Sequence, residues 1–317
     1  MKILITGSSG YVGYVLSKFF SEKGISVVGL DVVSNPVWKG NDHFVFQNCD
    51  VRDKKRMEEI FSREKPTRVI HLAYLMEPIH DQKKNYGIDV IGSQNVLEIA
   101  NVTRSVKQFV LFSSASAYGA RSDNKLWIAE EQSLRPRDYR YGIHKKIVEE
   151  HYNHYAKRKN LKTVILRMCT AIGPSYHKKG GVVSLLANAP IFFRLNGRYC
   201  EIQFLHEDDL TALLDLIVKD AKVEGTFNLA PDSFSTTKEL ATSNIFVPLR
   251  LGFMRVVIAL LWKLHLSSVM PAAMTLSTYG IVVSPEKLMK RYGYTFKYST
   301  LEGFRDTVKK RKELGTL

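Results

Sequence analysis

Cysteine is scarce in this sequence: Cys49, Cys169 and Cys200 are the only three among 317 residues. Their odd number and wide spacing exclude the disulfide framework of a small secreted protein and a zinc site made of paired cysteines. His151 and His154 lie three residues apart without a nearby third ligand, so no metal site is predicted. A chain that needs no disulfides is typical of a reducing compartment, and we predict a cytoplasmic protein.

Long apolar runs are missing as well. The N-terminal run ends at Thr6, which is too short for the core of a signal peptide. The longest stretch without Asp, Glu, Lys or Arg is 264–285, and it contains two prolines and several Ser and Thr residues. We therefore expect no transmembrane segment.

Acidic residues are outnumbered, because 46 Lys and Arg face 31 Asp and Glu and give a net charge of +15. The basic residues are mostly scattered doublets, and the only longer run is Lys309-Lys310-Arg311-Lys312. Without interleaved aromatic residues or a known module, this pattern indicates a solvated basic surface rather than a nucleic-acid-binding protein.

Short apolar runs alternate with longer amphipathic ones through the first 170 residues. We predict strands at 2–6, 25–30, 44–46, 68–72, 108–112, 163–167, 202–205 and 226–229, and helices between them, including 54–64, 83–103, 141–159 and 208–219. This alternation predicts an α/β fold with a doubly wound parallel sheet covered on both faces.

A glycine-rich loop, Gly7-Ser8-Ser9-Gly10-Tyr11-Val12-Gly13, lies between the first strand and the first helix. Gly7 permits a tight turn, Gly10 lets the backbone approach a pyrophosphate, and Gly13 lets the helix pack on the sheet. In this strand–turn–helix context the loop predicts a dinucleotide site of the Rossmann type, and the alternative is a purely structural turn.

Asp31 ends the second strand about 20 residues past the loop. A carboxylate at this place accepts hydrogen bonds from the adenosine ribose. Val32 and Val33 follow, and no arginine is close enough to hold a 2′-phosphate, so the sequence favours NAD over NADP.

Tyr141 and Lys145 form a YxxxK motif at the start of a predicted helix, which places both side chains on one face. A lysine ammonium favours the tyrosine phenolate, so Tyr141 can act as a base nearer neutral pH. The motif recurs at Tyr14/Lys18 and Tyr155/Lys159, which we interpret as surface pairs.

Position in the fold favours Tyr141 over the other two copies of the motif. It follows a strand that ends in a run of small and hydroxyl residues, 113–119, and ligands of open parallel sheets lie beyond the carboxyl ends of strands. Ser114, Tyr141 and Lys145 are therefore the predicted catalytic residues, with Ser116 as the competitor of Ser114.

With these motifs in order, the chain resembles the extended short-chain dehydrogenase/reductase family, in its NAD-dependent sugar epimerase/dehydratase branch. The resemblance covers about residues 1–230, and other matching segments are 50–53, 71–73, 166–167, 173–174 and 206–210. It implies cofactor contacts from the loop residues Gly7, Gly10, Tyr11, Val12 and Gly13, and from Asp31, Asp50, Val51, Leu72, Ala73, Tyr141, Lys145 and Cys169.

The resemblance also implies an NAD-binding Rossmann domain at 1–173 and about 202–230, with a smaller, interleaved substrate lobe at about 174–201 and 231–317. It further implies a homodimer formed by the helices at 83–103 and 141–159. His206 matches a family position, where we expect a capping or packing role rather than catalysis.

Departures from the family pattern bear on the reaction. Ala115 and Ser116 stand where 4,6-dehydratases carry an acidic pair, and Ile202 stands where 4-epimerases have the arginine that contacts the diphosphate. Lys178, Lys179, Arg194 or Arg198 are candidates to replace it. The sequence thus predicts an NAD-dependent epimerase/oxidoreductase acting on a nucleotide-activated sugar. The alternatives are an alcohol or ketone dehydrogenase with an apolar, hydroxysteroid-like substrate, or a non-catalytic NAD sensor.

Residues 251–266 form a strongly apolar segment that carries Arg255, Lys263 and His265. The favoured interpretation is a lid helix packed on the substrate lobe. The alternatives are a helix that rests on a membrane surface and a wall of a pocket for an apolar substrate.

Overall fold

The computed structural model describes residues 1–34, 41–75, 80–155, 161–176, 180–267 and 269–317. By its contacts the chain divides into two compact units. The first comprises Met1–Ser114, His144–Arg167 and Leu210–Phe227, and the second comprises Ala115–Ile143, Met168–Asp209 and Asn228–Leu317. The domain boundaries given above rest on expected function rather than on packing, and they stay a prediction.

The first unit is built on a seven-stranded sheet in the order β11-β6-β5-β4-β1-β2-β3. Its strands are β1 (Lys2–Thr6), β2 (Ser26–Asp31), β3 (Phe44–Asn48), β4 (Arg68–His71), β5 (Gln108–Ser114), β6 (Lys162–Met168) and β11 (Gly225–Leu229). β1 pairs in parallel with β2 and β4, β2 with β3, and β4 with β5, which confirms the predicted parallel α/β sheet.

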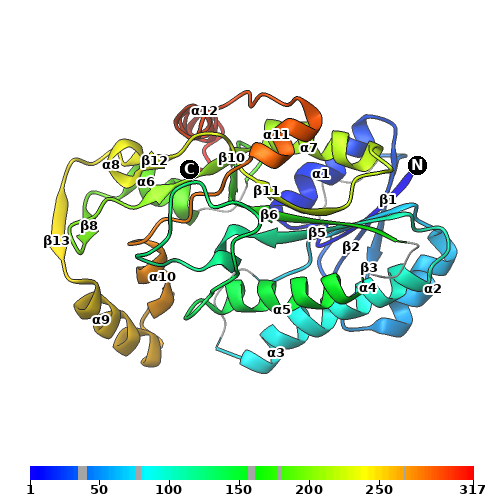
Figure 1. Cartoon of the computed structure of the whole chain (residues 1–317), viewed down its shortest axis with the longest axis horizontal. Helices are drawn as coiled ribbons and strands as arrows, with labels where there is room; N and C mark the ends of the chain where they lie inside the picture. The colour runs from blue at the N-terminus through cyan, green and yellow to red at the C-terminus, as the bar shows by residue number, and fades with distance from the viewer. Residues whose placement is uncertain (35–40, 76–79, 156–160, 177–179, 268) are drawn as a thin grey trace. The chain divides into compact units, whose positions relative to one another are not determined.

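Helices cover both faces of this sheet, with α1 and α7 on one side and α4 and α5 on the other (Figure 1). The helices are α1 (Tyr11–Glu22), α2 (Lys54–Glu64), α3 (Gln82–Tyr86), α4 (Ser93–Val102), α5 (Arg140–Tyr155) and α7 (Glu207–Lys219). Strands β1, β2, β4, β5 and β6 are buried nearly throughout, because a parallel sheet covered on both faces buries its apolar side chains on each side. In the edge strand β3 only Phe44 is buried.

The predicted helix at 83–103 is three consecutive segments, since a π-helical turn (Gly87–Gly92) joins α3 to α4. Gly92 lies against the loop after β3, where a Cβ on it would be 2.5 Å from Val51 Cγ2. The turn also carries the buried Asp89, and π turns of this kind are frequent at functional sites.

The second unit contains three two-stranded sheets, β10–β7 (parallel), β12–β9 (antiparallel) and β13–β8 (parallel), among its described residues. Its strands and helices are β7 (Thr170–Ile172), α6 (Gly181–Asn188), β8 (Phe192–Leu195), β9 (Glu201–Ile202), β10 (Phe204–His206), β12 (Ser235–Thr236), α8 (Thr237–Leu240), β13 (Phe246–Leu249), α9 (Leu251–Lys263), α10 (Pro271–Leu276), α11 (Glu286–Tyr292) and α12 (Thr300–Glu313).

The strand predicted at 202–205 was wrong as one element, because β9 and β10 belong to different sheets. Gln203 separates them. Its buried side chain donates to the carbonyls of Pro231 and Val283 and accepts from Val283 N–H. These bonds fix the backbone between the two pairings.

Candidate active site

The glycine loop turns sharply out of β1 toward α1. Gly7 has a φ of +72°, and the N–H groups of Gly7 and Ser8 both donate to Leu30 O at the end of β2. Gly10 N–H donates back to Gly7 O over 3.1 Å. A Cβ on Gly13 would lie 2.0 Å from Gly7 O, so the loop and the first turn of α1 can approach this closely only without a side chain.

Asp31 closes the loop from the end of β2. Its Oδ2 accepts from Ser9 N–H over 3.0 Å, and its Oδ1 accepts from Val32 N–H over 2.7 Å. Val32 and Val33 are exposed beside it. The carboxylate is thereby fixed next to the loop, as the predicted ribose contact requires.

Four further residues predicted to contact the cofactor follow the ends of β3 and β4 in the first unit. Ala73 N lies 2.8 Å from the Cβ position of Gly7, and Leu72 N–H donates to Thr6 O, so both residues border the loop. Val51 is buried, while Asp50 forms an ion pair of 2.6 Å with Arg52 that lowers the pKa of the Asp50 carboxyl.

Lys145 is buried inside the first unit, on α5. Its Nζ donates to Phe112 O of β5 over 2.6 Å and lies 3.1 Å from the centre of the Tyr74 ring. Burial lowers the pKa of Lys145 to about 7, although the carboxylates of Asp89 and Glu149 act in the opposite direction. A lysine with a pKa near neutrality, close to the end of a central strand, is typical of catalytic machinery.

The other predicted catalytic residues occupy the expected local positions. Ser114 is the last residue of β5, Ser116 lies in the 3₁₀ turn that follows (Ala115–Tyr118), and Tyr141 lies one turn before Lys145 on α5. Ser114 and Lys145 belong to the first unit, whereas Ser116 and Tyr141 belong to the second. The meeting of Ser114, Tyr141 and Lys145 around a substrate stays a prediction.

One of the two remaining copies of the motif differs from expectation. Tyr14 is buried in α1 rather than exposed, whereas Lys18 forms an ion pair with Glu22 over 2.7 Å. The surface-pair interpretation was therefore wrong for Tyr14. Lys159 lies outside the described residues.

Two buried ionic clusters around α5 were not predicted. Asp89 accepts from Leu75 N–H and from the side chain of Asn85, and it pairs with His144 over 2.9 Å. One turn after Lys145, Glu149 accepts two bonds from Nε and Nη2 of Arg167 and one from the Ser113 hydroxyl. Glu149 follows Lys145 by four residues on α5, a spacing that could have revealed it.

A polar chain also links β1, β4 and α4 beneath the loop. His71 Nδ1 lies 2.7 Å from Thr6 Oγ1, and His71 Nε2 lies 2.8 Å from Ser93 Oγ, which in turn donates to Asp89 O. Burial, with a smaller effect from Lys145, lowers the pKa of His71 to about 3, so this imidazole stays neutral in the folded protein.

The second unit holds a cavity of about 230 Å³ of its own. Its walls include Arg121, Arg137 and Arg255 together with Tyr139 and Tyr279. Asp123 and Asp138 also line it and pair with Arg121 and Arg255 over 3.0 and 2.8 Å. Three arginines against two aspartates leave the walls basic.

Four basic residues were candidates to replace the arginine that contacts the diphosphate in 4-epimerases, and the structure describes two of them. Lys178 and Lys179 lie outside the described residues. Arg198 pairs with Glu201 over 3.3 Å, and the Arg194 guanidinium lies 5.7 Å from the ring centre of Tyr199. Neither Arg194 nor Arg198 lines the cavity of the second unit.

Cys169 is buried in the second unit, and burial raises the pKa of its thiol. Its backbone N–H donates to Leu229 O over 3.1 Å. A neutral, buried thiol is also what a small packing residue would show, and the predicted contact of Cys169 with the cofactor stays a prediction. In the described parts of the chain, no group of three or more His, Cys, Asp or Glu is arranged to hold a metal ion.

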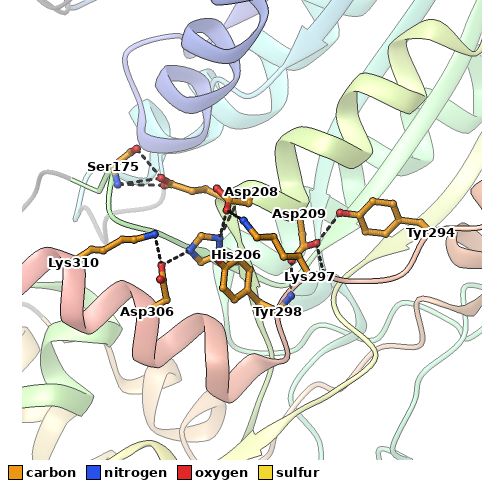
Figure 2. A network of polar contacts seen from close by, with 10 residues as sticks. Ser175, His206, Asp208, Asp209, Tyr294, Lys297, Tyr298, Asp306 and Lys310 are labelled. Carbon is orange, nitrogen blue, oxygen red and sulfur yellow. Dashed lines mark hydrogen bonds and ion pairs between the residues drawn. The ribbon is translucent and has the colours of Figure 1, made fainter.

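Figure 2 shows that His206 has the structural role predicted for it. Its Nδ1 accepts from Asp208 N–H in the first turn of α7, and its Nε2 pairs with Asp306 of α12 over 3.2 Å. Asp209 accepts from the Tyr294 hydroxyl and from Lys297 N–H. This network holds the start of α7 to the C-terminal segment of the second unit.

Comparison with known proteins gives a family match and similar folds. The NAD dependent epimerase/dehydratase family matches residues 3–230. A UDP-glucose 4-epimerase of Rhizobium meliloti is 29% identical over 187 residues, which cover 56% of this chain and 54% of that protein. A dTDP-D-glucose 4,6-dehydratase of Dictyostelium discoideum is 26% identical over 259 residues, or 73% and 58% of the two chains. The matches thus span little more than half the length of these curated relatives.

Solved structures resemble the chain over nearly its whole length. The Bordetella bronchiseptica enzyme WbmG in complex with NAD has a TM-score of 0.79 at 20% identity, covering 100% of this chain and 95% of that one. A UDP-glucose 4-epimerase of Thermotoga maritima with UDP-glucose has a TM-score of 0.78 at 22% identity, covering 99% of both. At these identities the likeness establishes the fold.

Proposed function

The chain belongs to the NAD dependent epimerase/dehydratase family, and from this premise we propose that it is an NAD-dependent epimerase/oxidoreductase acting on a hydroxyl or keto carbon of a nucleotide-activated sugar. The observation that carries the proposal is the setting of Lys145. A purely structural lysine gains nothing from burial, whereas a lysine that assists a neighbouring tyrosine needs a site that excludes water.

The loop of the first unit fits NAD. Because Gly10 and Gly13 carry no side chains, a pyrophosphate can approach the backbone N–H groups at the N-terminus of α1. The carboxylate of Asp31 can accept hydrogen bonds from the ribose hydroxyls. Leu72 and Ala73 border the same loop. When bound, NAD supplies a hydride acceptor and donor at its nicotinamide ring.

Gly13→Ala should abolish NAD binding, because its methyl group would have to displace Gly7 O and open the loop. A ligand at a hundredfold excess over its Kd stabilises the native state by about 2.7 kcal/mol, which a thermal-shift assay detects. The control is Gly252→Ala on α9, where a Cβ meets nothing within 4 Å. An NAD-dependent shift in Gly13→Ala equal to that of the wild type would contradict this role for the loop.

In the proposed reaction, three residues of the protein handle the proton and the oxygen of the substrate hydroxyl. Tyr141 takes the proton of the substrate hydroxyl, Lys145 lowers the pKa of Tyr141, and Ser114 orients the substrate oxygen. If the ketone formed in this way turns over before the hydride returns, the net reaction is an epimerisation. Ala115 and Ser116 supply no acid for a dehydration.

The basic cavity of the second unit supports an anionic substrate. Its arginines suit a diphosphate, and its tyrosines suit a base or a sugar ring. From the apolar segment 251–266 only Leu251 and Arg255 line this cavity, which favours a nucleotide sugar over an apolar alcohol.

A thermal-shift panel with UDP, dTDP, GDP and CDP on top of saturating NAD tests the substrate class. One nucleotide should raise Tm further, and its sugar conjugate should be turned over by the wild type but not by Tyr141→Phe. A shift with NAD and none with any nucleotide would reject the nucleotide sugar. Turnover by Tyr141→Phe at the wild-type rate would reject the role of the tyrosine.

The proposal includes a homodimer formed by α3–α4 and α5 and a cytoplasmic location. Tyr86, Ile91 and Val102 of the helical segment 82–102 are exposed apolar side chains, which supports the dimer. A monomer in light scattering would reject it. All three cysteines are free and buried, which accords with a reducing compartment.

A further inference from the structure

The helix α9 of the second unit presents an apolar face to solvent. Leu251 is its only buried residue, and the helix packs against α10. Phe253, Val256, Leu260 and Leu264 follow one another at intervals of three or four residues and therefore lie on one side of the helix. These four and Leu266 are between 56% and 72% exposed.

Cationic side chains accompany this apolar face. Arg250 precedes α9 and Lys263 is its last residue, and both are exposed. His265 has a φ of +58° and ends the helix, since its N–H donates to Trp262 O while Leu266 N–H donates to Leu261 O. From Leu240 to Pro285 the sequence contains no Asp or Glu. The surface therefore combines large apolar side chains with positive charge.

We propose that α9 docks on an anionic lipid surface, with Phe253, Val256, Leu260 and Leu264 in the interface and Arg250 and Lys263 against the headgroups. An amphipathic helix with Phe and Leu on one face and Lys or Arg beside it is typical of peripheral membrane binding. Among the described residues, no helix is long and apolar enough to cross a membrane, so the binding would be at the surface.

Charge favours lipid over a second copy of this chain. A two-fold interface brings the same patch of both copies together, so Arg250 and Lys263 would face one another. Such like charges oppose association, whereas anionic headgroups neutralise them. Arg255 is directed elsewhere, because it pairs with Asp138 at the cavity.

Sedimentation with vesicles tests the proposal on the full chain. The protein should bind vesicles of equal parts phosphatidylcholine and phosphatidylglycerol and should not bind pure phosphatidylcholine. Val256→Glu/Leu260→Glu should weaken binding by at least about tenfold. Arg250→Gln and Lys263→Gln should each weaken it about fivefold. The control Leu314→Glu places the same charge on another exposed leucine and should bind as the wild type does.

Several outcomes would overturn the proposal. These are no binding to either vesicle, equal binding to both, or equal binding by the wild type and Val256→Glu/Leu260→Glu. An oligomer in light scattering that this double variant dissolves, without any vesicle binding, would assign the face to a second copy instead. Because all substituted side chains are exposed, unchanged Tm values are expected and exclude misfolding as the cause.

Discussion

Lys145→Met should abolish turnover and at the same time make the folded protein more stable. The pKa of Lys145 falls from an ordinary 10.5 to about 7, and each pKa unit corresponds to about 1.4 kcal/mol. Holding the charged ammonium in this site at pH 6 therefore costs about 5 kcal/mol. Methionine fills a similar volume without charge, but it leaves Phe112 O without this donor, at about 1–3 kcal/mol. A net gain of about 2–4 kcal/mol remains.

The pH dependence identifies the cause of this gain. Between pH 7 and 10.5 the unfolded chain keeps the lysine proton that the folded chain has lost, so wild-type stability rises with pH through this window. The advantage of Lys145→Met is thus largest at pH 6 and shrinks as the pH approaches 10.5. Urea unfolding at pH 6 and pH 9 measures it.

The neighbouring lysine provides the control. Lys146 is partly exposed and lies 3.8 Å from Glu150, so Lys146→Met should change stability by less than about 0.5 kcal/mol and leave turnover intact. Turnover of the identified sugar nucleotide should fall by at least about 100-fold in Lys145→Met. A less stable Lys145→Met protein at pH 6, or a difference that does not vary with pH, would refute the argument.

Local signals explain which parts of the fold could be predicted. The glycine loop and Asp31 are encoded within about 25 consecutive residues, and alternation of apolar and amphipathic runs located every strand of the main sheet. The split at Gln203 could not be predicted, because it depends on the carbonyls of Pro231 and Val283, which are distant in sequence.

Partners distant in sequence also hid the buried charges. No sequence pattern pairs His144 with Asp89 or Arg167 with Glu149, and only the packing around α5 shows these contacts. The sequence also did not predict that one side of α9 is exposed, and the reason is different. Composition reveals an apolar helix, but it does not tell which face a neighbour covers.

Arg167→Met should destabilise the protein by about 3–5 kcal/mol, because it leaves the carboxylate of Glu149 buried without its partner. The side chains of Arg167 and Glu149 are only 8% and 1% exposed, so water cannot replace the lost bonds. The double variant Arg167→Met/Glu149→Leu removes both charges and should recover most of the lost stability. Urea unfolding measures both, and a double variant as unstable as Arg167→Met would contradict this.

The same pair of variants separates stability from catalysis. The Glu149 carboxylate raises the pKa of Lys145, so its removal lowers that pKa further below its ordinary value. Lys145 must be charged to assist Tyr141, and the alkaline limb of the pH–rate profile should therefore move to lower pH in Arg167→Met/Glu149→Leu. Glu149→Gln, which keeps the shape of the side chain, should shift the limb in the same direction. A purely structural cluster would change Tm and leave the pH profile where it is in the wild type.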